Sequence, residues 1–233
     1  MKRIFVPTRT GSDWQPLLAK PKLHWKMGAS AMTTAASWED SANGLPAEIR
    51  QQLNSASEPL LQDLQLLAAF PEWEVKLPGG ETTSNTDVLA ICRNERGLCV
   101  VAVEAKVHED FGPLVSEKRT SKSTNQLERL RYLHNVLKVQ RFDDSIRYQL
   151  LHRTASAILT ASDFHSPVAV MLVQAFDSPH DRKSDFISFC EAMGANEIAP
   201  NLYSVPGFAD PKLFLAWCDG NTDYRNVQLD SML

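Results

Sequence analysis

Two neighbouring apolar segments carry charged residues at positions where a strand buries most of its side chains. Residues 84–90 are Ser-Asn-Thr-Asp-Val-Leu-Ala, and after a short turn residues 100–107 are Val-Val-Ala-Val-Glu-Ala-Lys-Val. Strand side chains alternate between two faces, so Glu104 and Lys106 must point to the same one. Burying an acid and an amine on an otherwise apolar strand is costly unless something uses them. A divalent cation held by Asp87 and Glu104, with Lys106 beside it, would explain all three residues.

The composition is that of an ordinary globular protein. The chain has 233 residues, of which 43% are hydrophobic and 22% charged, which fits one large domain or a domain with an added lobe. No apolar run approaches the roughly 18 residues that a membrane span needs. The four cysteines form no CxxC pair, and Cys92 and Cys99 lie in apolar runs. We therefore expect buried free thiols in a soluble, cytoplasmic protein with no membrane partner.

The charge is unevenly spread along the chain. The net charge of −4 argues against a strongly basic nucleic-acid coat, but metal-dependent nucleic-acid enzymes have acidic sites themselves. Residues 1–26 hold six lysines and arginines and one aspartate. Such a cluster is usually solvated surface, and a patch that faces phosphates is the alternative.

Hydrophobic periodicity predicts an α/β domain with a mixed sheet. Alternation and apolar runs predict strands over residues 73–77, 87–92, 98–107, 168–176 and 202–205. Helical spacing predicts helices over residues 28–38, 47–53, 57–70, 124–137, 144–161, 182–193 and 211–218. We expect residues 1–56 to form a helical extension packed on a core of residues 57–233, the two together forming one compact unit.

On this order of elements, Asp87 and the Glu104-x-Lys106 triplet resemble the motif of the PD-(D/E)XK superfamily of restriction-endonuclease-like nucleases. In that superfamily an acid on the second core strand and an acid-x-Lys on the third bind Mg²⁺ and activate water against a phosphodiester. The resemblance covers residues 57–176, about half of the chain. The proline of the motif is absent and Thr86 replaces it, which is a common departure. The resemblance implies a mixed β-sheet flanked by helices, with extra N-terminal and C-terminal helical elements.

The resemblance also implies a metal site. Asp87 and Glu104 would bind Mg²⁺, with Mn²⁺ as an alternative, and Lys106 would orient or deprotonate the attacking water. Members of the superfamily often add one more acid near the first strand. Glu72 is the preferred candidate for that metal ligand, and Glu58 is the alternative.

Some members add a glutamine from the helix after the third strand, and two glutamines qualify. Gln126 begins the first predicted helix after that strand, and Gln149 lies in the second. The second helix also carries Arg147 and Arg153, which are candidate substrate-binding residues together with Gln126. Its polar side either faces the metal or faces water, and we prefer Gln149 as the catalytic glutamine.

The expected function is therefore Mg²⁺-dependent hydrolysis of phosphodiester bonds. The expected partner is nucleic acid, with DNA preferred on its frequency within the superfamily, and a homodimer is implied by nucleases that pair two sites across a duplex. The alternative is a catalytically inactive protein of the same fold with a binding or regulatory role. Carboxylates paired to Arg147 or Arg153, or a cleft plugged by the N-terminal helices, would favour that alternative.

Overall fold

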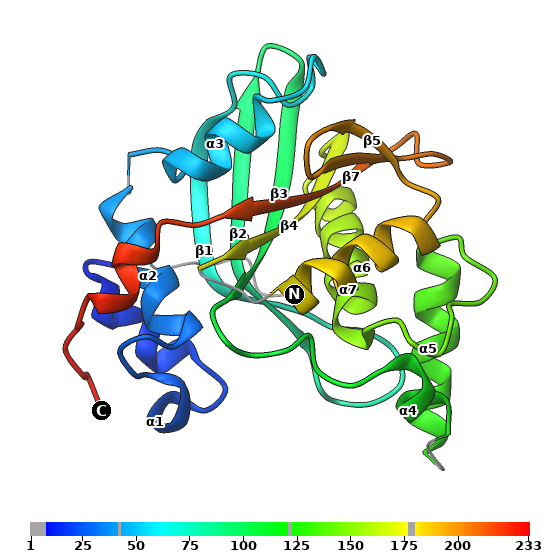
Figure 1. Cartoon of the computed structure of the whole chain (residues 1–233), viewed down its shortest axis with the longest axis horizontal. Helices are drawn as coiled ribbons and strands as arrows, with labels where there is room; N and C mark the ends of the chain where they lie inside the picture. The colour runs from blue at the N-terminus through cyan, green and yellow to red at the C-terminus, as the bar shows by residue number, and fades with distance from the viewer. Residues whose placement is uncertain (1–7, 42, 121–122, 177–179) are drawn as a thin grey trace.

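A mixed sheet forms the centre of the protein and helices cover both of its faces (Figure 1). The computed structural model describes residues 8–41, 43–120, 123–176 and 180–233, so residues 1–7 and 42 of the expected N-terminal extension lie outside it. The strands are β1 (Gln65–Val75), β2 (Ser84–Asn94), β3 (Gly97–Lys106), β4 (Val168–Ala175), β5 (Asn196–Ala199), β6 (Leu202–Val205) and β7 (Lys212–Asp219). The helices are η1 (Gly11–Leu17), α1 (Pro21–His24), α2 (Ser30–Asp40), α3 (Ala47–Leu53), α4 (Val115–Arg119), α5 (Thr124–Val136), α6 (Tyr148–Asp163), α7 (His180–Ala192) and η2 (Thr222–Asn226).

The strand order is β1-β2-β3-β4-β7-β6-β5. The first three strands form an antiparallel meander, and β4 then runs parallel to β3 after the chain has passed through α4, α5 and α6. Strand β7 is parallel to β4, and β6 and β5 complete the sheet in antiparallel pairings. The expected α/β class with a mixed, helix-flanked sheet is confirmed.

The two faces of the sheet bury two separate apolar cores. On β3, Val100 and Ala102 join the core under α6 and α7, whereas Val101 and Val103 join the core under the N-terminal helices. This alternation follows from the two-residue period of a strand. Figure 1 shows α6 and α7 on one side of the sheet and α2 and α3 on the other. A strand buried on both faces must be apolar throughout, which is why charged side chains near the end of β3 are conspicuous.

The N-terminal elements are tied to the rest of the protein by three tryptophans. All three are buried in the core that these elements share with the sheet. Their indole N–H groups donate hydrogen bonds to Glu39 (Trp14, 2.7 Å), to the carbonyl of Asp230 (Trp25, 3.1 Å) and to Gln174 (Trp38, 3.1 Å). Buried indoles usually find such partners, and here they fix the N-terminal layer to the sheet and to the C-terminal segment.

Two predicted helices are wrong. Most of the C-terminal half of the predicted helix over residues 57–70 belongs to β1, which pairs with β2 along its length. Because β1 is an edge strand, it also tolerates Pro71, which we had expected to end a helix. The predicted helix over residues 211–218 is β7, a strand buried on both faces whose continuous apolar run cannot be told from a buried helix by periodicity.

The cysteines behave as expected from the sequence. All four, Cys92, Cys99, Cys190 and Cys218, are buried and free. Among the helices that the structure describes, none has both the length and the apolar composition that crossing a membrane requires.

Candidate active site

Three carboxylates stand in one row across the first three strands. In the β1–β2 pairing, Pro71 lies opposite Val88 and Trp73 lies opposite Thr86, so Glu72 is opposite Asp87. On the other side of β2, the pair Val88–Val103 places the preceding residue, Asp87, opposite Glu104. Opposed residues on neighbouring antiparallel strands have Cβ atoms about 5 Å apart. The sheet register therefore brings together three acids that are far apart in the sequence.

The backbone of β1 is irregular at the first member of this row. Glu72 has φ +51°, in the left-handed region that residues with a Cβ rarely adopt. Phe70 and Trp73 are three residues apart, yet both pack on the α6 side, with ring centroids 5.3 Å apart. The alternation of side chains between the two faces of β1 is therefore interrupted between these two residues. Holding a non-glycine residue in this conformation costs about 1–3 kcal/mol, and such strain is typical of functional sites.

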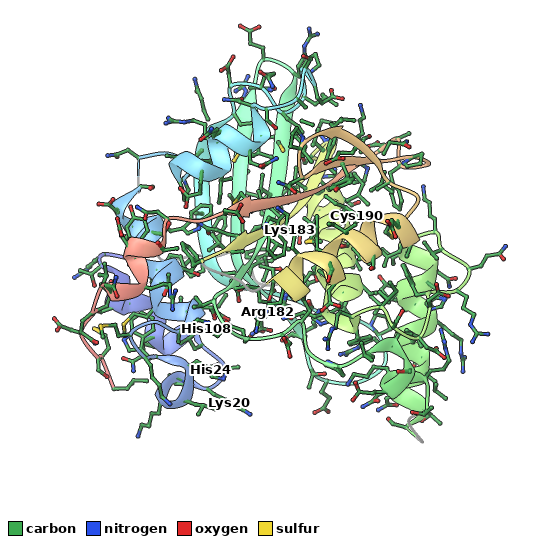
Figure 2. The ribbon with its side chains drawn as sticks, viewed as in Figure 1. Lys20, His24, His108, Arg182, Lys183 and Cys190 are labelled. Carbon is green, nitrogen blue, oxygen red and sulfur yellow. The ribbon has the colours of Figure 1, made fainter. Side chains whose placement is uncertain are left out.

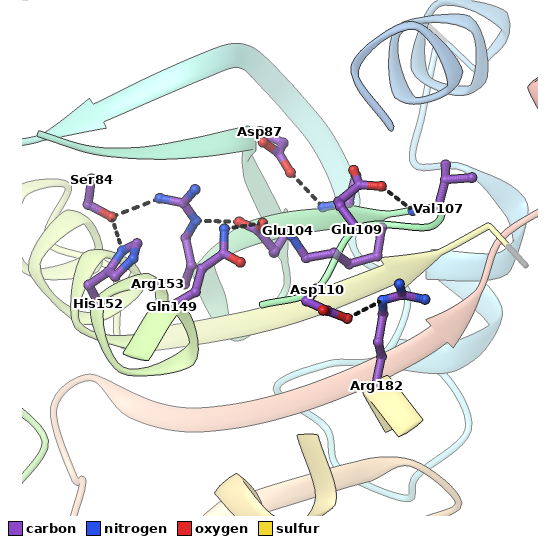
Figure 3. A network of polar contacts seen from close by, with 12 residues as sticks. Ser84, Asp87, Glu104, Val107, Glu109, Asp110, Gln149, His152, Arg153 and Arg182 are labelled. Atoms are coloured by element: carbon purple, nitrogen blue, oxygen red, sulfur yellow. Dashed lines mark hydrogen bonds and ion pairs between the residues drawn. The ribbon is translucent and has the colours of Figure 1, made fainter. Parts of the chain in front are cut away.

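Both carboxylate oxygens of Glu104 are engaged (Figure 3). Lys106 Nζ and Gln149 Nε2 each donate to Oε1 at 2.7 Å, and Arg153 Nε donates to Oε2. The Glu104 side chain is only 2% exposed. Burial alone would raise the pKa of Glu104, but the cationic groups of Arg153 and Lys106 outweigh it and hold the pKa below its ordinary value. Glu104 is therefore a charged, fully partnered carboxylate.

The other two acids lack such compensation. Asp87 Oδ2 accepts a hydrogen bond from the backbone N–H of Ala105 at 2.7 Å. Burial and the neighbouring charge of Glu104 raise the pKa of Asp87 to about 7. Burial and the charge of Asp87 raise the pKa of Glu72 to about 8. Three acids thus share the cations of Lys106 and Arg153, and the charged forms of Asp87 and Glu72 are disfavoured.

Helix α6 supplies a second line of polar contacts beside the row. Arg153 Nη1 donates to Ser84 Oγ at 3.0 Å, and the same hydroxyl lies 2.8 Å from His152 Nδ1. Burial, together with the positive charges of Arg153 and of Arg129, keeps the pKa of His152 well below its ordinary value. The helical pattern had drawn attention to residues 149–153, but nothing in the sequence pointed to Ser84, whose partners are more than 60 residues away.

A cleft of about 480 Å³ opens beside this arrangement. Its floor is made by residues of the carboxylate row and of α6, namely Glu72, Glu74, Asp87, His152 and Arg153. Its sides come from the β1–β2 connection and the start of β2 (Thr82, Thr83, Asn85) and from the N-terminal segment (Leu18, Ala19, His24, Ser30, Ala31). The N-terminal elements thus contribute part of the lining of the cleft.

The donor set suits a hard divalent cation, although the side chains are not arranged around one. In the described part of the chain, no three His, Cys, Asp or Glu side chains are grouped so as to hold a metal ion. The reason is visible at Glu104, whose oxygens bind Lys106, Gln149 and Arg153. Carboxylate oxygens are the ligands that Mg²⁺ prefers. Among the residues that the structure describes, no group donates a hydrogen bond to the buried Gln149 Oε1, which could therefore accept one from a water. A cation at Asp87 and Glu104 requires the Arg153 side chain to move.

The structure does not bring every candidate residue to this site. Arg147 donates instead to Asp185 Oδ2 at 2.8 Å and to the carbonyl of Gly112 at 3.0 Å. Gln126 lies in the first turn of α5 and shares no hydrogen bond with the site residues that the structure describes. Glu58, the alternative to Glu72, pairs with Lys212 at 2.7 Å. Arg153 is at the site, but it binds Glu104 where we had expected a substrate contact.

The sheet and its carboxylate row define an α/β protein with an acidic cleft beside its first two strands. The chain belongs to the family DUF6946, described as a domain of unknown function, whose family model matches residues 7–222. No curated protein and no solved structure matches the chain.

Proposed function

We propose that the protein is a metal-dependent nuclease that hydrolyses phosphodiester bonds, with DNA as the expected substrate. The observation that carries the proposal is the row of Glu72, Asp87 and Glu104, with Lys106 two residues further along β3. The antiparallel β1–β2–β3 meander followed by a parallel β4 supports a restriction-endonuclease-like fold. In the PD-(D/E)XK superfamily, which the sequence resembles, these strands present the same residue types.

The charge of the site supports a cationic cofactor. Mg²⁺, or Mn²⁺ in its place, would be held by Asp87 and Glu104 with Glu72 as the additional ligand. Bound there, it would supply a coordinated water of lowered pKa and neutralise charge that develops on the phosphate. It would also favour the charged forms of Asp87 and Glu72, whose pKa values are raised by burial and by the neighbouring acids.

The remaining side chains have separable roles. Lys106 is held by Glu104 at 2.7 Å and lies 5.2 Å from the centre of the Phe111 ring, so its ammonium group is fixed beside the acids. From there it orients the attacking water or stabilises a phosphate oxygen. Gln149 anchors Glu104 through its Nε2 and leaves Oε1 to accept a hydrogen bond from a water. Arg153, once released from Glu104, is a donor for a phosphate oxygen.

A panel of substrates tests this proposal. Plasmid, linear duplex and single-stranded DNA are incubated with the protein in Mg²⁺, in Mn²⁺ and in EDTA, together with the Asp87→Asn variant. Asparagine keeps an acceptor for the Ala105 N–H but removes the charge. We expect metal-dependent cleavage of at least one substrate by the wild type and its loss in the variant. Cleavage that persists in EDTA, or in Asp87→Asn, contradicts the proposal.

One observation favours a second function, a catalytically inactive protein of the same fold that binds a ligand. Arg153 occupies the Glu104 oxygen that a metal would need. A structural ion pair of this kind neutralises the acid permanently. If calorimetry shows no Mg²⁺ or Mn²⁺ binding that depends on Asp87, and no substrate in the panel is cleaved, this second function replaces the first.

A further inference from the structure

The wall of the cleft formed by the β1–β2 connection is held rigidly by a single arginine. Arg129 of α5 donates from Nη2 to the carbonyl of Thr82 at 2.7 Å, from Nη1 to the Thr82 hydroxyl at 3.0 Å, and from Nε to the carbonyl of Pro78 at 3.0 Å. Gly79 has φ +83°, and a Cβ there would collide with the carbonyl of Asn125. The connection is therefore pressed against α5 and cannot swing outward without breaking these contacts.

The facing wall, made by the N-terminal segment, is fixed as well. Trp25 follows α1, is 7% exposed and donates to the carbonyl of Asp230. Trp14 precedes the cleft residues Leu18 and Ala19, is 5% exposed and donates to Glu39. Both indoles are packed in the core that the N-terminal elements share with the sheet. The width of the cleft is thus set by two anchored walls.

The size of this cleft limits what can reach the carboxylate row. About 480 Å³ lies within the roughly 300–1,000 Å³ of sites that take one small-molecule ligand. Such a space accommodates about one nucleotide of a single strand. Two paired strands with both of their backbones do not fit into it together. A nucleotide can enter only when its strand is unpaired.

The surface next to the cleft suits the backbone of such a strand. His24 of α1 lines the cleft. Three lysines close to His24 in the sequence have exposed side chains, namely Lys20, Lys22 and Lys26. Figure 2 shows Lys20 and His24 close together on this segment. Within the described residues these three lysines make no ion pair, so their charges are available. Of the basic cluster seen in residues 1–26, Lys2 and Arg3 lie outside the described residues.

We infer that the substrate is single-stranded nucleic acid, or the unpaired end of a duplex. It is guided along Lys20, Lys22 and Lys26 into the cleft between His24 and the carboxylate row. This inference rests on the proposed nuclease function and specifies its substrate. The three lysines neutralise phosphates, and the apolar side chains of Leu18 and Ala19 face a base that enters the cleft.

Binding and cleavage are measured separately so that the two proposals can fail independently. Binding is followed by fluorescence anisotropy in EDTA, with a labelled single strand of about 20 nucleotides and with a closed circular duplex as unlabelled competitor. The wild type is compared with the triple variant Lys20→Gln, Lys22→Gln, Lys26→Gln. The control is Arg93→Gln, Arg96→Gln, which removes exposed cations at the far end of β2. Cleavage of both DNA forms is then measured in Mn²⁺.

We expect the single strand to bind the wild type at least about tenfold more tightly than the duplex. Each phosphate contact to a single strand contributes about 0.7 to the slope of log Kd against log salt, so the triple variant should lower that slope by about 2. The control should leave it unchanged. Equal affinity for the two DNA forms, an unchanged slope in the triple variant, or cleavage of the closed circle as fast as the single strand overturns the inference. Selective single-strand binding without cleavage of any DNA contradicts only the nuclease proposal.

Discussion

Arg153 of α6 donates its Nε–H to Oε2 of Glu104 on β3, and the two side chains are 10% and 2% exposed. This ion pair joins the helix that crosses over the sheet to the acid at the β3 end of the carboxylate row. Together with Lys106, it neutralises one of the three acids of the row. In the proposed nuclease, the same pair is what a metal ion must displace.

Replacing Arg153 with methionine should destabilise the fold and reveal the competition between its guanidinium group and a metal ion for Glu104. Removing one partner of a buried ion pair costs about 3–5 kcal/mol in the free energy of unfolding, and here it leaves Glu104 paired with Lys106. Mg²⁺ should restore part of that loss, because the freed Glu104 oxygen becomes a ligand. Urea denaturation with and without about 10 mM Mg²⁺ measures both effects.

Arg147→Met is the matched control, because its ion pair with Asp185 lies outside the site and is partly exposed. It should cost no more than about 1 kcal/mol, and its stability should not respond to Mg²⁺ more than that of the wild type. If Mg²⁺ stabilises Arg153→Met no more than the control, the competition between the guanidinium group and a metal ion is refuted.

Lys106→Met should separate catalysis from metal binding. The methionine fills a similar volume but removes the ammonium group, which we place at the water or the phosphate. Loss of such a group lowers rates by about 10²–10⁴-fold. Single-turnover cleavage should fall by this factor, while the Mn²⁺ affinity measured by calorimetry is retained or increases, because Lys106 no longer occupies Glu104 Oε1. A variant that cleaves at the wild-type rate rules out the role of Lys106.

The buried imidazole of His152 should make stability depend on pH. Its pKa in the folded protein lies well below 6.5, whereas in the unfolded chain it is close to 6.5. The stability that the neutral form provides is therefore complete above pH 6.5 and is lost as the pH falls, because only the unfolded chain takes up the proton. Each pH unit below that value should cost the wild type up to about 1.4 kcal/mol more than His152→Asn. If the free energies of unfolding of the wild type and of His152→Asn change equally between about pH 7.5 and 5.5, His152 does not titrate in this way.

Arg129→Ala should loosen one wall of the cleft without unfolding the protein. Its guanidinium group satisfies several carbonyl groups of the β1–β2 connection, each worth about 1 kcal/mol net. Limited proteolysis should cut residues 78–83 faster in the variant, while hydrogen exchange in β3 and β4 stays slow. Equal cutting of wild type and variant would mean that other contacts hold this wall. Arg131→Ala, on the exposed side of α5, is the control.

The sequence allowed the prediction of those site residues whose positions follow from a local pattern. Asp87, Glu104 and Lys106 could be placed because the two-residue period fixes which side chains share a strand face. Gln149 could be associated with them because some members of the superfamily that the motif resembles add a glutamine from a helix after the third strand, and Arg153 lies one turn further along the same predicted helix. These residues were proposed from local patterns, the order of elements and that resemblance.

The remaining features depend on pairings that no local pattern encodes. Strand β1 resembles a helix in its apolar spacing and becomes a strand because it pairs with β2. The position of Glu72 opposite Asp87 follows from that register and from a left-handed residue, and neither leaves a signal in the sequence. Ser84 and the pairing of Arg153 with Glu104 depend on how α6 is seated on the sheet.

The proposed metal site is tested most directly by the rate of phosphodiester cleavage as a function of Mn²⁺ concentration, measured for the wild type and for Asp87→Asn. The control is Asp185→Asn, which removes a carboxylate outside the row. We expect saturable, Mn²⁺-dependent cleavage in the wild type and the control, and a loss of at least about 100-fold in Asp87→Asn. Absence of cleavage in the wild type at every Mn²⁺ concentration, or an undiminished rate in Asp87→Asn, would contradict it.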